Sequence, residues 1–486
     1  MVIMQPPRVR LSPELEISQL VCGLWQVADM EKDGSTLDPQ EAANHLEAYV
    51  RDGFDSFDMA DHYGSAEIIT GALLSRYQEH TQRPKAFTKW CPSPGPMTPD
   101  IVRAGVQERL DRLGVAKIDL LQFHWWTFEH PAWLDCLHEM KALQEEGLIG
   151  GIGVTNFDAA HLHLAIADGI PILTNQVSFS MIDRRAAGAL SQLSAEKGVK
   201  LFAYGTLCGG FLSDKWLGQA EPKEISDWSK AKYKRFIDVG GGWIAFQNLL
   251  QVASRIAKKH KVSISNVASR WVLEHDSVAA TIIGARIGEN EHRGDNLKIF
   301  EFSLDAEDHQ NLNEAFAQMQ PIPGDCGDEY RRPPFLTASG DLSHHLSAIP
   351  SAYEASQMQH RKGARVLTGS IWEDIVGYSR AVRVKNTIHV SGTTATHAAN
   401  RCVAPGDAGA QTVYILDKIA ASLSALGGTM KDVVRSRIYM RNLADWEPVS
   451  RAHGNVFREI APANTLIGAE LVGDYEVEIE VEAIVD

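Results

Sequence analysis

Short apolar runs alternate with segments of helical period between residues 20 and 285. The runs are rich in β-branched and aromatic residues, and most lack the alternation of a half-exposed strand, as expected for strands buried on both faces. Between them, apolar residues recur three and four positions apart, as at Val102, Val106, Leu110 and Leu113, which predicts amphipathic helices. Eight strands are predicted, at LVCGLW (20–25), FDSFD (54–58), AFTKW (86–90), IDLLQFH (118–124), IGGIGVTN (149–156), ILTNQV (172–177), KLFAYG (200–205) and ATIIGA (280–285).

This repeated strand and helix pattern predicts an α/β protein with a closed (β/α)8 TIM barrel, since parallel strands need helical crossovers. An open doubly wound sheet is the alternative. It is disfavoured because no GxGxxG follows the first strand. In addition, polar residues follow many of the strands, whereas a doubly wound sheet gathers them at one switch point.

Four polar residues, Asp58, Tyr63, Lys89 and His124, fall at or just past the ends of apolar runs. The carboxyl ends of barrel strands are where this fold gathers catalytic groups. Each residue alone has a plainer explanation, such as a helix cap or a hydrogen-bonded core group. Together, at successive strand ends, they predict a site that reduces a carbonyl group.

The order and strand positions of several motifs resemble the aldo-keto reductase superfamily over about residues 14–330. Any one motif would be a weak signal, but the set in this order is specific. The motifs are GFDSFDMADHYGSAE (53–67), FTKW (87–90), LLQFHWW (120–126), GIGVTNF (151–157), NQVSFSMIDRR (175–185), AYGTLCGGFL (203–212) and IIGARIGENEHRGDN (282–296).

The resemblance implies a role for each of the four polar residues. Reduction needs a hydride at carbon and a proton for the developing alkoxide, and Tyr63 would be the general acid. A nearby ammonium favours a phenolate, so Lys89 would tune Tyr63, with Asp58 holding Lys89 charged and oriented. His124 would hydrogen-bond the substrate carbonyl and set its approach to the nicotinamide.

The same resemblance implies a bound nicotinamide cofactor. Arg286 suits a 2′-phosphate, because a guanidinium can grip phosphate with two parallel bonds, so NADPH is favoured over NADH. The stretch 284–296 is longer than the common form, which leaves the assignment of Asn290 and the role of Arg293 open. The implied cofactor residues are Gly23, then Thr155, Asn156 and Gln176 at the carboxamide, Tyr204 stacked on the ring, Gly205, Leu207 and Gly209 in a pyrophosphate loop (205–213), and Arg286, Asn290 and Asn296 at the adenosine end.

Aromatic residues suggest where the substrate lies. Trp25, Trp125 and Trp126 resemble the wall of the family's substrate pocket, although tryptophans also fill barrel cores. The long connection 213–245 carries its own aromatic residues. It is interpreted either as a loop that covers substrate or cofactor or as an outer layer packed on neighbouring helices.

The barrel leaves enough chain for a second domain. Residues 1–335 are assigned to the barrel with a C-terminal extension, 336–362 to a linker, and 363–486 to a small α+β domain. Strands are predicted at 364–369, 387–392, 432–441 and 475–485, the last alternating apolar residues with glutamates. Two amphipathic helices between them would cover one face of the sheet.

This second domain resembles the Rid (YjgF) family of reactive-intermediate deaminases, a chorismate-mutase-like fold. The resemblance rests on GYSRAVRV (377–384), HVSG (389–392), ALGG (425–428), DVVRSRIYMRNLADW (432–446), APANT (461–465) and VEIEVEAI (477–484). Deaminating members carry an arginine where this chain has Asn464, and Arg380 or Arg451 would have to replace that charge. The implied pocket residues are Tyr378, Arg380, Ser391, Gly392, Asn464 and Glu482.

Composition mainly excludes function classes. The net charge of −15 argues against sequence-independent binding to nucleic acid or acidic membranes. No apolar run approaches the roughly 20 residues of a membrane helix, and the N-terminus lacks a signal-peptide core. The six scattered cysteines form no CxxC pair, so no metal site is expected and a cytoplasmic location is predicted.

The sequence therefore predicts an NADPH-dependent enzyme that reversibly reduces a small aldehyde or ketone. The Rid-like domain would serve mainly in assembly, as a trimer or hexamer, or in ligand binding. Two alternatives stay open. One is a bifunctional enzyme that also deaminates an imine or enamine, and the other is a nucleotide-sensing regulatory protein.

Overall fold

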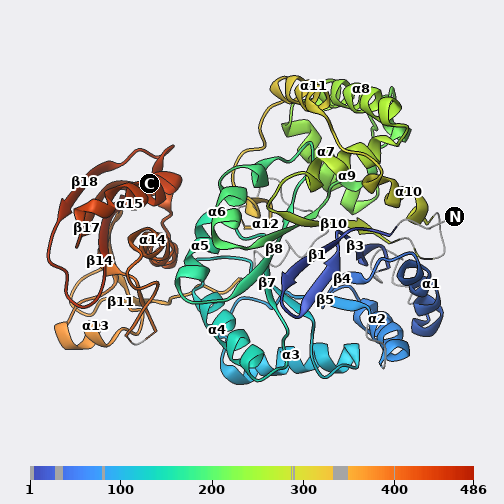
Figure 1. Cartoon of the computed structure of the whole chain (residues 1–486). Helices are drawn as coiled ribbons and strands as arrows, with labels where there is room; N and C mark the ends of the chain where they lie inside the picture. The colour runs from blue at the N-terminus through green and yellow to red at the C-terminus, as the bar shows by residue number, and fades with distance from the viewer. Residues whose placement is uncertain are drawn as a thin grey trace.

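The protein has two domains that lie side by side (Figure 1). The larger contains the segments coloured blue to yellow, and the smaller contains those in orange and red. This computed structural model describes residues 5–27, 37–78, 83–285, 287, 291–331, 349–398 and 400–486.

The larger domain is a closed barrel of eight parallel strands, in the order β10-β3-β4-β5-β6-β7-β8-β9. All eight predicted strands are present, and the barrel is confirmed. Most of their residues are buried on both faces, which explains the nearly continuous apolar runs. The strands are β3 (Leu20–Gly23), β4 (Ser56–Ala60), β5 (Lys85–Trp90), β6 (Leu120–His124), β7 (Ile152–Thr155), β8 (Ile172–Ser178), β9 (Lys200–Tyr204) and β10 (Val278–Gly284).

Helices surround the barrel and a hairpin closes its amino end. The hairpin, β1 (Arg8–Ser12) and β2 (Leu15–Ser18), packs Leu15 and Ile17 against the residues that fill the barrel interior. The helices are α1 (Pro39–Arg51), α2 (Ala66–Leu74), α3 (Pro99–Leu113), α4 (Ala132–Glu145), α5 (Ala159–Ala167), α6 (Ala189–Lys197), α7 (Trp228–Val239), α8 (Gly242–His260), α9 (Ile264–Leu273), α10 (Arg293–Leu297), α11 (Ala306–Ala317) and α12 (Asp328–Arg331).

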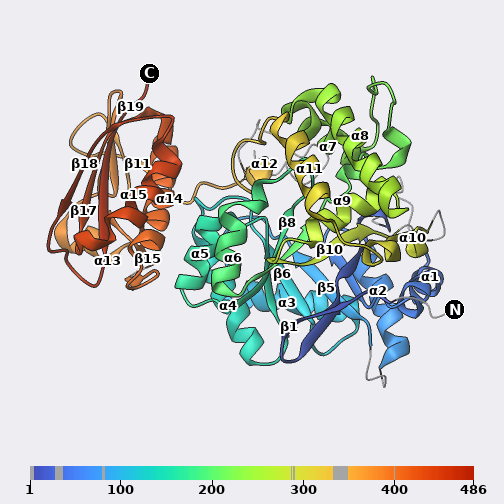
Figure 2. The same ribbon diagram turned by 45° about the horizontal axis from the view of Figure 1, so that its top comes forward.

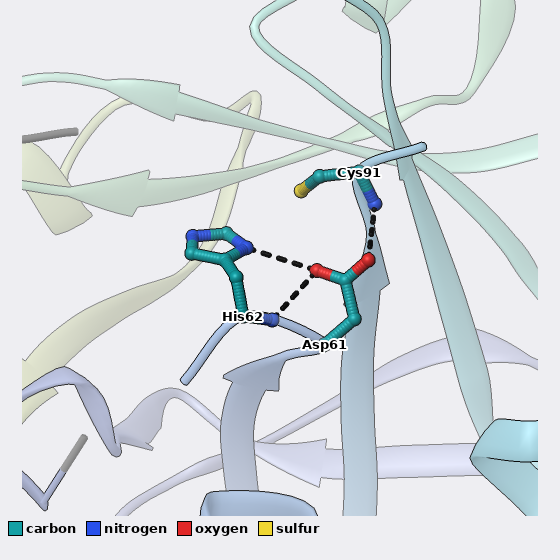
Figure 3. A group of neighbouring side chains, drawn as sticks. All are labelled: Asp61, His62 and Cys91. Atoms are coloured by element: carbon teal, nitrogen blue, oxygen red, sulfur yellow. Dashed lines mark hydrogen bonds and ion pairs between the residues drawn. The ribbon is translucent and has the colours of Figure 1, made fainter. Parts of the chain in front are cut away.

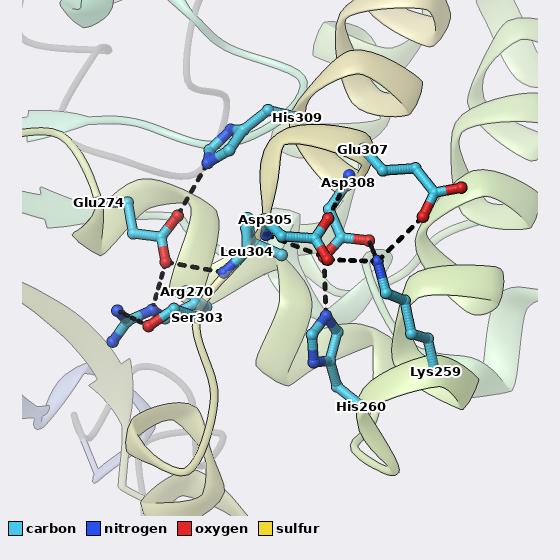
Figure 4. A network of polar contacts seen from close by, with 10 residues as sticks. All are labelled: Lys259, His260, Arg270, Glu274, Ser303, Leu304, Asp305, Glu307, Asp308 and His309. Atoms are coloured by element: carbon cyan, nitrogen blue, oxygen red, sulfur yellow. Dashed lines mark hydrogen bonds and ion pairs between the residues drawn. The ribbon is translucent and has the colours of Figure 1, made fainter.

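Polar contacts fix the helix ends. Lys259, at the end of α8, places its Nζ 2.7 Å from Asp305, the residue that caps α11, and 2.9 Å from Asp308 (Figure 4). His260 Nε2 lies 2.7 Å from the other oxygen of Asp308. The cationic end of α8 thus meets the acidic start of α11, as the helix dipoles favour.

The smaller domain is a seven-stranded mixed sheet with α14 and α15 on one face (Figure 2). Val477, Ile479 and Val481 of its central strand point toward the helices and are buried, as the alternation predicted. The strand order is β11 (Ala355–Gln357), β12 (Ala364–Val366), β13 (Ala381–Val384), β14 (Thr387–Thr394), β19 (Val477–Ile484), β17 (Val433–Met440) and β18 (Ala463–Gly468). The helices are α13 (Ile371–Val376), α14 (Ala408–Ala425) and α15 (Trp446–Phe457), and β15 (Thr396–His397) pairs with β16 (Arg401–Cys402).

Three strands of this sheet were not predicted from the sequence. One of them, β11, falls inside the segment assigned to the linker and pairs antiparallel with β12. The second domain therefore starts structurally before residue 363.

In the part of the chain that the structure describes, the helices are too short or too polar to cross a bilayer.

Candidate active site

A buried ion pair joins two neighbouring barrel strands. Lys89 on β5 places its Nζ 2.7 Å from Asp58 Oδ2 on β4, and both side chains are nearly excluded from solvent. The other oxygen of Asp58 accepts hydrogen bonds from the side-chain amides of Gln122 at 2.9 Å and Gln176 at 2.6 Å. The Asp58 carboxylate is therefore well satisfied, and it holds the Lys89 ammonium in a fixed position.

Tyr63 lies beside this pair, on the loop that follows β4. Its backbone N–H donates to Ala60 O at 3.0 Å, which turns the chain back over the strand end. The Lys89 Nζ is 5.2 Å from the centre of the Tyr63 ring. On the other side, the Trp25 ring meets Tyr63 edge-on, with 4.9 Å between the ring centroids. The structure thus brings Asp58, Tyr63 and Lys89 together, as the sequence predicted.

His124, the last residue of β6, completes the predicted group of four. It is 5% exposed, and among the described residues nothing hydrogen-bonds its Nε2. Burial lowers the pKa of His124 well below its usual value, and the nearby charges of Arg331 and Lys89 act in the same direction. The neutral ring is able to donate one hydrogen bond from Nε2 to a carbonyl oxygen.

The residues expected to hold the nicotinamide lie together at the carboxyl ends of the neighbouring strands β7, β8 and β9. Thr155 is buried, and its Oγ1 has no hydrogen-bond partner in the described part of the chain. Asn156 has a left-handed backbone, with φ of 59°, and its Oδ1 accepts from Tyr204 Oη at 2.9 Å. Gln176 contacts Asp58, as described above. An unpartnered hydroxyl beside an aromatic ring fits an amide-bearing ring as ligand.

The loop after β9 is covered by α7. Gly205 and Gly209 both have positive φ angles, and a β-carbon on either would collide with the Tyr233 ring of α7. This explains why glycines occupy those positions. Elsewhere in the connection 213–245, Trp216 and Trp243 pack on one another and on Phe211. The connection thus covers the predicted cofactor loop with α7 and packs as an outer layer elsewhere.

Other predicted cofactor positions are only partly described. Arg286 and Asn290 lie outside the described residues. Asn296 lies in α10, and its backbone N–H donates to His292 O at 2.8 Å. Arg293 pairs with Asp52 at 2.8 Å and so ties α10 to the end of α1. A β-carbon on Gly23 of β3 would lie 2.9 Å from Ile282 of β10, so the two strands approach closely there. Leu207 is partly buried and packs against the core.

The three tryptophans separate into two environments. Trp25 contacts Tyr63, and Trp126 lies 4.5 Å from His124 between ring centroids, so each borders one of the predicted catalytic residues. Trp125 is fully buried, stacks on Phe123 at 5.6 Å and donates its indole N–H to a backbone oxygen. Trp125 thus lies in the core, the alternative that the sequence left open for these tryptophans.

The C-terminal extension of the barrel crosses the site, which sequence reasoning missed. Tyr330 of α12 lies 5.4 Å from His124 between ring centroids, and Lys232 of α7 donates to the Tyr330 hydroxyl. Arg331 donates to the backbone oxygen of Asn156. No local pattern marks these residues. Gln122 was also missed, although a lone polar residue two positions before His124 in an apolar strand is a readable signal.

Asp61, His62 and Cys91 converge (Figure 3), and the His62 ring lies 4.8 Å from that of Tyr63 between centroids. Asp61 Oδ1 accepts from both the backbone and Nδ1 of His62, at 2.8 and 2.9 Å, and its Oδ2 accepts from the Cys91 backbone N–H at 3.0 Å. Burial raises the pKa of Asp61, but the hydrogen bond and charge of His62 outweigh it, and the net shift is downward. The carboxylate is thus satisfied by protein donors, and it orders the loop that carries Tyr63.

In the second domain, four predicted pocket residues gather at β13 and β14. The Arg380 guanidinium is buried and donates to the Tyr378 hydroxyl at 2.7 Å and to the backbone oxygens of Ser391 and Gly392. Arg380 therefore organises the backbone here.

The other two predicted residues lie on different strands. Asn464 on β18 donates to Ser436 Oγ at 2.9 Å, and Glu482 on β19 pairs with Arg437 at 3.0 Å. Arg451 is exposed and pairs with Glu447 on its own helix. One chain therefore does not bring the six predicted residues into one pocket.

The fold and this arrangement define a β/α barrel with a Tyr, Lys, Asp and His site at the carboxyl ends of its strands. Residues 19–317 match the family model described as the aldo/keto reductase family, and the chain belongs to that family. Residues 370–485 match the model described as Endoribonuclease L-PSP, so the second domain is of the YjgF type.

Several known proteins are similar to this chain. It is 35% identical over 180 residues to flagellar radial spoke protein 5 of Chlamydomonas reinhardtii and 30% identical over 205 residues to the protein tas of Escherichia coli. These matches cover 32% and 38% of this chain but only 33% and 58% of those proteins, less than two thirds of each. The barrel also resembles glycerol dehydrogenase from Gluconobacter oxydans, with a TM-score of 0.54, 21% identity, and coverage of 67% of this chain and 98% of that one.

Proposed function

We propose that this protein reduces a small aldehyde or ketone with NADPH, and catalyses the reverse oxidation of the alcohol. The observation that carries the proposal is the buried Lys89 and Asp58 pair beside Tyr63, facing a neutral His124 whose Nε2 has no partner among the described residues. These are the groups that proton delivery to a carbonyl oxygen requires.

Each side chain has a distinct task in this reaction. When bound, NADPH supplies the hydride that the carbonyl carbon accepts. His124 donates a hydrogen bond to the carbonyl oxygen and fixes its position. Tyr63 transfers its phenolic proton to that oxygen as negative charge develops, and the Lys89 ammonium stabilises the phenolate that remains. Asp58 pairs with Lys89 and holds it in place.

The described residues also fit the cofactor. Thr155 Oγ1 and the Tyr204 ring would meet the nicotinamide, and the glycines after β9 would let the chain approach the pyrophosphate closely. A screen of aldehydes, ketones and imines by NADPH oxidation tests the proposal on the full chain. Turnover of carbonyl compounds supports it, whereas NADPH binding without turnover of any carbonyl would favour the nucleotide-sensing alternative.

The preference for NADPH over NADH rests on Arg286. Its guanidinium can grip the 2′-phosphate that only NADPH carries. Replacement by alanine should weaken NADPH far more than NADH. Equal weakening of both cofactors would mean that another residue reads that phosphate.

We further propose that the second domain assembles the protein as a trimer, or a hexamer of paired trimers. The sheet face opposite its helices carries Arg437 paired with Glu480 at 2.6 Å and with Glu482, a polar surface suited to an interface. Light scattering on the full chain tests this, and a monomer would refute it.

A cytoplasmic location accords with the six cysteines, all described, of which none forms a disulfide.

Deamination by the second domain is the weaker candidate. Asn464 is neutral and hydrogen-bonded to Ser436, and Arg380 is occupied by backbone oxygens, so neither offers a free charge for a substrate carboxylate. Hydrolysis of 2-iminopropionate by the full chain would instead support the alternative of a bifunctional enzyme.

A further inference from the structure

Paired acidic and basic side chains join the two domains, some of them on the two facing helices α5 and α14. Helix α14 lies between its own sheet and helix α5 of the barrel, which Figures 1 and 2 both show. Within the described residues, four pairs of acidic and basic side chains bridge the domains. They are His161 with Asp417 at 3.0 Å, His163 with Asp407 at 2.7 Å, His397 with Asp135 at 2.7 Å, and Arg401 with Asp168 at 2.8 Å.

One of these pairs differs from the rest because it continues to Asp158, at the end of the segment 155–158. His161 Nδ1 lies 2.7 Å from Asp158 Oδ2, while its Nε2 reaches Asp417 of the second domain. The ring also stacks flat on Phe128, with 3.6 Å between centroids and an interplanar angle of 8°. Burial alone would lower the pKa of His161, but Asp158 and Asp417 outweigh it and raise that pKa to about 9. The ring is thus a buried cation clamped between two carboxylates, one from each domain.

Asp158 ends the segment that carries the predicted nicotinamide residues. Its Oδ1 accepts from the backbone N–H of His161 at 2.9 Å and so caps α5. The three residues before it include Thr155 and Asn156, and Asn156 holds an unfavourable left-handed backbone. Such a conformation persists only when its surroundings hold it. The Asp158 cap fixes the chain two residues beyond Asn156.

We infer that Asp417 of the second domain is a positioning residue for the reductase site, acting through His161 and Asp158 on the segment 155–158. In this view the second domain is part of the cofactor site, although it touches no cofactor. The inference rests on the proposed function only for the identity of the ligand. The order of the segment itself is a property of the protein alone.

Two matched variants of the full chain test this. Asp417→Asn removes the charge that clamps His161, and Asp407→Asn removes an equivalent charge from the neighbouring pair with His163. Asp407 also caps α14, a role that asparagine keeps. Both variants weaken the same domain interface by one ion pair. In the described structure only His161 continues to Asp158, so only Asp417→Asn should disturb the segment 155–158.

Two readouts are measured on both variants, without and with cofactor. Hydrogen exchange should be faster in peptides covering residues 153–163 for Asp417→Asn and unchanged for Asp407→Asn. The Kd of NADPH, from fluorescence, should rise about five- to tenfold for Asp417→Asn, with kcat nearly constant, and less than twofold for Asp407→Asn. Asp417→Glu restores the charge and should recover most of the affinity.

Equal effects of the two asparagine variants, or no effect of either on the exchange of 153–163, would overturn the inference. The exchange experiment needs no cofactor. If the wild-type protein bound no NADPH, the proposed function would fail, while exchange would still decide whether Asp417 orders the segment.

Discussion

Replacing Asp58 by asparagine tests the buried charge at the centre of the site. The change keeps the shape of the side chain but leaves the Lys89 ammonium without its carboxylate, 2.7 Å away, in a place that is 4% exposed. Gln122 and Gln176 donate hydrogen bonds to the Asp58 carboxylate, and the side-chain oxygen of asparagine is a weaker acceptor for them. Removing one partner of a buried pair costs about 3–5 kcal/mol, because an uncompensated charge remains.

The thermal midpoint gives the clearest measure of this cost. For a domain of this size, 3–5 kcal/mol corresponds to a fall in Tm of roughly 4–8 °C, measured by circular dichroism on the apo protein. Glu146→Gln is the matched control, because Glu146 pairs with Arg103 at a similar distance but both side chains are about half exposed. That variant should shift the Tm by no more than about 1 °C.

Activity should separate from stability in a further variant. The double variant Asp58→Leu, Lys89→Met removes both charges, so its Tm should be higher than that of Asp58→Asn. Carbonyl reduction should be abolished in both variants. A fall in Tm for Asp58→Asn no larger than that for Glu146→Gln would refute the reasoning.

Two other predictions concern the cofactor loop and the domain interface. Gly209 and Gly114 share a φ of 62°, but only at Gly209 would a β-carbon meet another side chain, Tyr233. Alanine should cost about 1 kcal/mol at Gly114, from the backbone angle alone, and more at Gly209, where Tyr233 must also shift. Only Gly209→Ala should raise the Kd of NADPH; equal Kd values would contradict the covering role of α7. The raised pKa of His161, about 9 against an ordinary value of 6.5, predicts that its contribution of about 3 kcal/mol is complete below pH 6.5 and is lost as the pH rises through 9. Tm measured from pH 6 to pH 10 should therefore fall more steeply in the wild type than in His161→Gln, and parallel curves would argue against a buried cation.

Much of the barrel could be predicted from the sequence, because strands buried on both faces leave uninterrupted apolar runs. The segment 86–90, for example, became β5 over Lys85–Trp90. The four catalytic candidates were readable for a related reason. Parallel strands end at one rim, so residues at strand ends meet in space even when they are far apart in the chain.

The parts that could not be predicted depend on surroundings. The strand β18 is largely exposed and has no apolar face to reveal it, and β11 is only three residues long. The core position of Trp125 could not be chosen from the sequence, because composition does not say which side of a strand end a tryptophan takes. His161 and Asp417 are 256 residues apart, and no local pattern could pair them.

The central claim is that Tyr63 is the proton donor of a carbonyl reductase. Tyr63→Phe removes one hydroxyl and keeps the ring against Trp25, so NADPH should bind with nearly unchanged Kd. Single-turnover reduction of a carbonyl substrate found in the screen should fall about 10²- to 10⁴-fold, the usual contribution of a general acid. Near-normal turnover by Tyr63→Phe, with intact NADPH binding, would contradict the account.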